Sequence, residues 1–131
     1  MASLERWSPY MRSILRIMVG LLFLEHGLAK LIGFPPPPNP MPPLFSLYGI
    51  QGIIEVVGGV LLALGALTRP VAFILAGDMA VAYFMAHAPK SFFPLLSGGD
   101  AAILYCFIFL YIFFAGAGPW SVDRAIGRSA S

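Results

Sequence analysis

Four long apolar segments, separated by short runs of turn-forming residues, constrain this 131-residue chain more than any other feature. They lie at about residues 13–33, 44–67, 70–88 and 98–116, and each could cross the roughly 30 Å hydrocarbon core of a bilayer as a helix. Because that core holds no water to satisfy free backbone groups, such segments have to be helical. The sequence therefore predicts an all-α fold: an integral membrane, four-helix transmembrane bundle that forms a single domain over residues 1–131.

The composition agrees with a membrane environment. Hydrophobic residues make up 59% of the chain and charged residues 11%, whereas soluble domains carry about 25% charged residues. The net charge of +2 is scattered, without the basic block that nucleic-acid binding requires. The single cysteine, Cys106, supports neither a disulfide framework nor a paired-cysteine redox motif.

The connections between the segments carry clear turn chemistry. The proline-rich stretch 34–43 cannot continue a helix and predicts a stiff external loop. Thr68 is expected to cap the third helix, with Pro70 in its first turn. Ser97 and Asp100 have the spacing of a capping box at the start of the fourth helix.

The distribution of Lys and Arg predicts the orientation in the membrane. Most of the basic residues fall at one side of the predicted bundle, and Lys30 and Lys90 fall at the other. Since cytoplasmic loops carry an excess of Lys and Arg, both termini are expected in the cytoplasm. The basic residues on the cytoplasmic side are Arg6, Arg12, Arg16, Arg69, Arg124 and Arg128.

Ionisable residues inside the apolar segments form a predicted polar layer in the outer half of the bundle. A charge at the bilayer centre costs about 2.5–3.5 kcal/mol, so these side chains are expected to face the bundle interior and to pair. Carboxylates and a histidine held there could exchange protons with a ligand. The candidates for ligand binding and proton exchange are Glu25, His26, Lys30, Gln51, Glu55, His87 and Asp100.

Other polar residues have simpler interpretations. Arg16 can reach Asp78 from the first helix and form a structural ion pair. Gln51, Glu55, Gly58, Leu62 and Gly65 follow a helical stripe, beside which Gly52 and Gly59 permit close helix approach. His26 and His87 could in principle hold a haem, but two histidines without further constraint disfavour this reading, and no metal site is predicted. The aromatic residues of 98–116 are expected to face lipid and to pack, or to form a flat wall against a ring.

Several motifs together resemble the DoxX family of small bacterial membrane proteins. They are "EHGLAKLIGF" (25–34), "GIIEVVGGVLLALGALTRPVA" (52–72), "HAPKSFF" (87–93), "GGDAAILY" (98–105) and "GAGPWSVD" (116–123). The resemblance implies a four-helix bundle in the bacterial inner membrane and, more loosely, a redox association, because relatives include a membrane subunit of a thiosulfate:quinone oxidoreductase. Asp100 stands where family members often have glutamate.

Three hypotheses about function remain open. The first is a membrane subunit of a quinone-linked or oxidative-stress-related oxidoreductase system, in which the polar layer binds a small, quinone-like redox molecule and a partner subunit supplies the electrons. The second is a small transporter or proton-coupled permeation unit, forming a homo-oligomer, in which Asp78 continues the route inward. The third is an assembly partner whose buried charges only stabilise the bundle. Whether the chain is itself an enzyme stays open.

Overall fold

The computed structural model describes residues 2–32, 47–87 and 99–127, and over these residues the protein is all-helical. Its four long helices are α2 (Ser8–Ile32), α3 (Leu47–Leu64), α4 (Thr68–Ala82) and α6 (Asp100–Ala115). The predicted all-α class is confirmed. The proline-rich stretch 34–43 lies outside the described residues.

Three short elements accompany the long helices. Helix α1 (Ala2–Glu5) precedes α2, a π-helical turn η1 (Tyr83–His87) continues α4, and α7 (Val122–Ala125) follows α6. The sequence did not predict α1 or α7, because four residues are too few to show a helical period. Helix α2 also begins five residues before the predicted Ser13, and Pro9 in its first turn suits that start.

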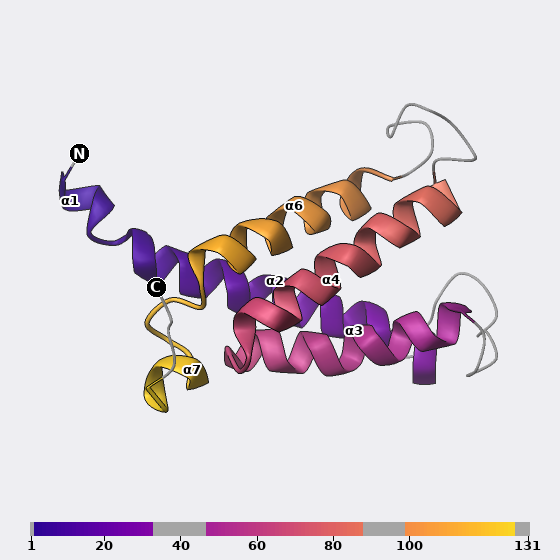
Figure 1. Ribbon diagram of the computed structural model, residues 1–131, viewed down its shortest axis with the longest axis horizontal. Coiled ribbons are helices and arrows are strands. Elements are labelled where there is room, and N and C mark those ends of the chain that lie inside the picture. The colour runs from indigo at the N-terminus through magenta and orange to yellow at the C-terminus, as the bar shows by residue number, and fades with distance from the viewer. Residues whose placement is uncertain (1, 33–46, 88–98, 128–131) are drawn as a thin grey trace.

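The long helices are arranged as two closely packed pairs, α2 with α3 and α4 with α6 (Figure 1). Helices α3 and α4 meet at the turn 65–67 and separate toward their other ends. The two chain ends, the turn 65–67 and α7 all lie at the left end of the bundle in this view. This end corresponds to the predicted cytoplasmic side.

Glycines let α2 and α3 approach to backbone contact. A Cβ added at Gly20 would lie 2.6 Å from the backbone nitrogen of Ala63, and one at Gly27 would lie 2.7 Å from that of Val56. A Cβ at Gly59 would lie 2.8 Å from the nitrogen of Leu24. Small residues at a helix interface allow this spacing, as the stripe on the second segment predicted.

The core lies where the two helix pairs meet. Phe23 of α2, Leu62 of α3, Leu75 of α4 and Phe109 of α6 are almost completely buried. The remaining buried apolar side chains of this core are Val19, Ala72, Ala76, Met79, Ala102 and Ile112. All four long helices therefore contribute to one hydrophobic cluster.

The outer surface is also rich in large apolar side chains. Phe73, Phe84, Phe107 and Phe114 are each more than half exposed. Judged on the described residues, none of the helices has both the length and the apolar character needed to cross a bilayer. The membrane-spanning part of the prediction therefore stays a prediction.

Candidate functional site

Two of the predicted site residues, Glu25 and His26, lie on the exposed side of α2. The expectation that they face the bundle interior is wrong. The interior face of this turn belongs to Phe23 and Gly27. A rotation of about 100° per residue puts Glu25 on the opposite side of the helix and His26 at the edge of the interior face, about 60° from Phe23. Lys30 follows His26 by one turn, but its side chain lies outside the described residues.

His26 contacts Tyr105 of α6, and Glu25 precedes His26 in the chain. The imidazole of His26 and the phenol ring of Tyr105 are in edge contact, with centroids 5.8 Å apart. Glu25 is near enough for its charge to act on the Tyr105 hydroxyl. On the side toward the bundle core, the ring of Phe23 packs against those of Tyr105 and Phe109, with centroid distances of 5.6 and 5.0 Å. We call Glu25, His26, Tyr105, Phe23 and Phe109 the α2–α6 cluster.

The hydrogen bonding of His26 fixes which ring nitrogen carries its proton. Its Nδ1 lies 2.9 Å from the carbonyl oxygen of Leu22. A carbonyl only accepts hydrogen bonds, so Nδ1 must be the donor, and Nε2 of the neutral ring is then an acceptor. The α2–α6 cluster thus presents an acceptor nitrogen, a carboxylate and a phenol above a floor of two buried aromatic rings.

The candidates on α3 form a separate, buried group. Gln51 and Glu55 are four residues apart, on the same face of α3, and Glu55 is completely buried. The contact of Gly27 with Val56 puts Glu55 near the depth of Glu25. The two carboxylates therefore share a layer, as predicted, but one is inside the bundle and the other is on its surface.

The remaining candidates lie at or near helix ends. His87 is the last residue of η1, and its side chain is outside the described residues. Asp100 is exposed and begins α6. The predicted capping box is wrong, because the N-cap of α6 is Gly99 and no side chain caps it.

Arg16 binds backbone carbonyls and not the predicted Asp78. Its side chain is completely buried. Nε donates to the carbonyl of Ala117 at 3.0 Å, and Nη1 donates to those of Leu62 and Ala63 at 3.0 and 3.2 Å. Nη2 donates to the carbonyl of Trp120. The last carbonyls of α3 lie within reach of Arg16 and accept from its guanidinium, that of Leu62 in addition to the N–H of Gly65.

Asp123 caps α4 from the other end of the sequence. Its two carboxylate oxygens accept hydrogen bonds from the backbone N–H groups of Leu67 and Thr68, each at 2.9 Å. The Thr68 hydroxyl makes no cap, and it has no hydrogen-bond partner among the described residues. The predicted Thr68 cap is therefore wrong, because Leu67 occupies the N-cap position in a left-handed conformation.

The sequence predicted neither the carbonyl partners of Arg16 nor the capping of α4 by Asp123. The motif at 116–123 was visible, but nothing in it indicates that it folds back onto α2 and the turn 65–67. Gly118 has a positive φ of 84°, and a Cβ there would lie 2.3 Å from Oγ of Ser13. Tyr105 was likewise assigned to lipid or packing, since its distance from His26 depends on how α2 and α6 pack.

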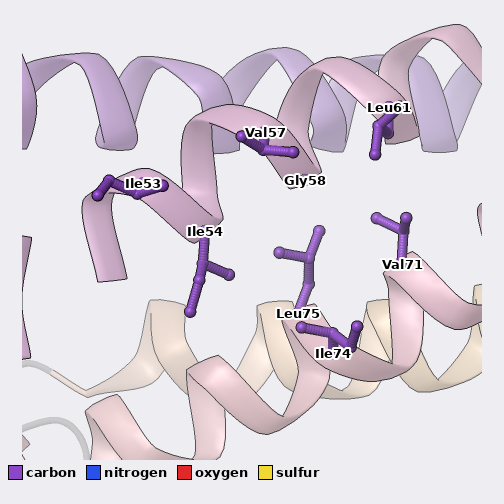
Figure 2. Close-up of a pocket in the computed structure, with 8 residues that line it drawn as sticks. All are labelled: Ile53, Ile54, Val57, Gly58, Leu61, Val71, Ile74 and Leu75. Atoms are coloured by element: carbon purple, nitrogen blue, oxygen red, sulfur yellow. The ribbon is translucent and has the colours of Figure 1, made fainter. Parts of the chain in front are cut away.

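A second feature is an apolar groove between α3 and α4, of about 300 Å³. Figure 2 shows Ile54 and Leu61 of α3 and Val71 and Leu75 of α4 pointing toward one another across it. The groove is lined by Ile53, Ile54, Val57, Gly58, Leu61, Val71, Ile74 and Leu75. It contains none of the predicted site residues.

Comparison with known proteins gives a consistent picture. The model of the DoxX family matches residues 11–88. An uncharacterized protein of Haemophilus influenzae is 40% identical, over 95% of this chain and 96% of its own length. An uncharacterized membrane protein of Mycobacterium tuberculosis is 29% identical, over 89% of this chain and 82% of its own length. No solved structure gives a significant match.

Proposed function

The chain belongs to the DoxX family, and from this membership we propose that it is an integral inner-membrane protein whose α2–α6 cluster binds a small quinone-like molecule. In this role it serves an oxidoreductase system in which a partner subunit supplies or removes the electrons. The observation that carries the proposal is the contact of His26 with Tyr105 beside the buried rings of Phe23 and Phe109, with Glu25 next to His26 on the exposed side of α2.

A membrane location is supported by the surface of the helices. Phe84, Leu104, Phe107 and Phe114 are each 63–76% exposed, an arrangement that lipid favours and water does not. The relative from Mycobacterium tuberculosis carries the description of a membrane protein. Helix α7 and the starts of α2 and α4 lie at one end of the bundle (Figure 1), and Arg6, Arg69 and Arg124 lie in or next to these segments, which agrees with a cytoplasmic position for that end.

The chemistry of the cluster fits a quinone or quinol head group. Nε2 of His26 and the carboxylate of Glu25 can accept hydrogen bonds from a ring hydroxyl, and the Tyr105 hydroxyl can donate one to a ring carbonyl. The exposed ring of His26 and the partly exposed ring of Tyr105 offer a surface for a planar ring, and the buried Phe23 and Phe109 support them from inside the bundle. His26 and Glu25 would thus orient the ligand and take up or release its protons.

We find no electron carrier in the part of the chain that the structure describes. The chain's only cysteine is Cys106, so it holds no cysteine pair. In the described residues, no three His, Cys, Asp or Glu side chains are grouped to hold a metal ion. The proposed site therefore binds and protonates, while a partner subunit exchanges electrons with the ligand.

Binding of a short-chain ubiquinone to the full chain in mild detergent tests the proposal. Tyr105→Phe should weaken binding roughly tenfold, as expected for the loss of about 1–1.5 kcal/mol of hydrogen bonding. Tyr111→Phe is the matched control, because this exposed tyrosine lies on the same helix outside the cluster. His26→Phe should abolish the interaction while keeping an aromatic ring.

The outcomes separate ligand binding from a purely structural role. A quinone that copurifies with the protein, and is lost from the His26→Phe variant, would support the site. A protein that binds no quinone, or binds it equally well in all three variants, would contradict it. The role of an assembly partner, in which buried residues such as Glu55 of α3 and Asp78 of α4 only stabilise the bundle, would then be the better hypothesis.

A further inference from the structure

A row of contacting rings joins the beginning and the end of the chain. The guanidinium of Arg6 lies 5.6 Å from the centroid of the Trp7 ring. The ring centroids of Trp7 and Tyr10 are 5.6 Å apart, and those of Tyr10 and Trp120 are 5.5 Å apart. We call Arg6, Trp7, Tyr10, Trp120 and Arg124 the terminal patch, Arg124 lying four residues after Trp120 on α7.

The bundle holds this patch in place. The backbone N–H of Trp120 donates to Oγ of Ser13 at 3.1 Å, and the carbonyl of Trp120 accepts from the buried Arg16. Even so, the indoles of Trp7 and Trp120 are 55% and 54% exposed. Two large aromatic side chains are thus fixed at one end of the molecule with half of their surface uncovered.

The charge around these rings is positive. Arg6 and Arg124 are exposed, and Arg12 and Arg69 are partly exposed at the same end. Of the six acidic residues in the chain, Glu5 and Asp123 lie at this end. Asp123 is buried and accepts hydrogen bonds from the start of α4. The acidic side chain exposed on this surface is Glu5, whereas four arginines are exposed or partly exposed there.

From this arrangement we infer that the terminal patch binds the head groups of anionic phospholipids. Tryptophan and tyrosine are the residues that settle at the level of lipid head groups. Arginine near that level attracts anionic lipid and pairs with phosphate through its planar fork of donors. The occupant is a lipid phosphate, because the exposed indoles need an apolar boundary that a dissolved phosphate lacks.

The inference rests on the proposed membrane location, and it is independent of ligand binding at the α2–α6 cluster. Trp7 and Trp120 are the only two tryptophans in the chain, so its tryptophan fluorescence reports on the patch alone. The test uses vesicles of equal parts phosphatidylcholine and phosphatidylglycerol, with brominated acyl chains on one lipid or on the other. Bromine quenches a tryptophan only at close range.

Brominated phosphatidylglycerol should quench the wild-type protein more strongly than brominated phosphatidylcholine does. The local enrichment of the anionic lipid is expected to be about fivefold for each arginine. Arg6→Gln with Arg124→Gln should remove the part of the difference that these two arginines contribute and leave a much smaller one from Arg12 and Arg69, and Arg6→Lys with Arg124→Lys should retain most of the difference. Lys90→Gln, which removes a charge from the predicted opposite side, should leave the difference unchanged.

Each other result overturns a specific statement. Equal quenching of the wild-type protein by both lipids overturns the lipid inference and leaves the membrane location standing. A preference for the anionic lipid that is unchanged in the double glutamine variant also overturns it, because Arg6 and Arg124 of the terminal patch would then contribute nothing to it. Absence of quenching by either lipid overturns the membrane location itself, and the lipid inference with it.

Discussion

Arg16 and Asp123 bind the two sides of one turn, the turn 65–67 between α3 and α4. Arg16 donates to the carbonyls of Leu62 and Ala63 at the end of α3, and Asp123 accepts from the N–H groups of Leu67 and Thr68 at the start of α4. The end of a helix carries a partial negative charge and its beginning a partial positive charge. Each charged side chain therefore compensates the helix end that it touches.

Replacing Asp123 by asparagine should lower the free energy of unfolding by about 1–3 kcal/mol, because an amide can accept from one of the two N–H groups but not from both. Chemical denaturation in detergent, followed by helical circular dichroism, measures this loss. Asp100→Asn is the control, since Asp100 is exposed at the start of α6 and caps nothing. Equal stability of the two variants would contradict the assigned cap.

Thr68→Val should leave the free energy of unfolding within about 0.5 kcal/mol of wild type or raise it slightly. The Thr68 hydroxyl is buried without a hydrogen-bond partner among the described residues, and its replacement by a methyl group of similar shape costs little. A threonine that capped the helix would cost about 1 kcal/mol on substitution. The same denaturation experiment distinguishes the two values.

Arg16→Lys should destabilise the protein by about 3 kcal/mol or more, despite the conserved charge. A lysine ammonium cannot reach carbonyls that surround a planar guanidinium on three sides, and burial leaves it poorly solvated. Arg6→Lys, on the surface, serves as the matched control and should change stability by less than about 0.5 kcal/mol. Similar melting temperatures for the two variants would show that the carbonyl contacts of Arg16 matter little.

Two adjacent glycines of α3 should respond differently to alanine. A Cβ at Gly59 would meet the backbone of α2, with the nitrogen of Leu24 at 2.8 Å, so the helices must separate and stability should fall by about 1–3 kcal/mol. A Cβ at Gly58 would meet only the flexible end of the Leu75 side chain, at 2.6 Å. Leu75 can turn into the apolar groove beside it, so Gly58→Ala should cost clearly less.

The exposed Gly77 of α4 provides the reference for these two variants. Nothing lies within 4 Å of a Cβ at this position, so Gly77→Ala should be neutral or stabilise the protein by up to about 1 kcal/mol through helix propensity. Melting temperatures in one detergent rank the three variants. An order other than Gly77, Gly58, Gly59, from most to least stable, would contradict the packing described here.

The sequence predicts the four long helices because each is a continuous apolar segment bounded by proline, glycine or polar residues. It also predicts that α3 can approach a neighbouring helix closely, since Gly52 and Gly59 are seven residues apart and fall on one helix face, but it does not indicate that this neighbour is α2. Details that depend on distant parts of the chain could not be predicted. Local rules assigned the cap of α4 to Thr68, whereas the residue that provides it, Asp123, is 55 positions away.

The predicted site likewise has some features that follow from local sequence patterns and others that depend on how distant segments pack. The depth shared by Glu25 and Glu55 follows from counting residues along two antiparallel helices. Which of them is buried depends on the rotation of each helix about its axis, and this is decided by where Gly27 and Phe23 pack. Tyr105 joins the cluster through the packing of α6 beside α2, which no local pattern in either segment specifies.

The fold of this protein has a consequence for its biosynthesis. Two of the four carbonyl partners of Arg16, Ala117 and Trp120, are made 101 and 104 residues after it. Until they arrive, the guanidinium lacks part of its binding site and the start of α4 lacks its cap. A product that stops short of Asp123 therefore keeps the backbone hydrogen bonds of the turn 65–67 but lacks the cap of α4, so its two halves should be held together less firmly than in the finished fold.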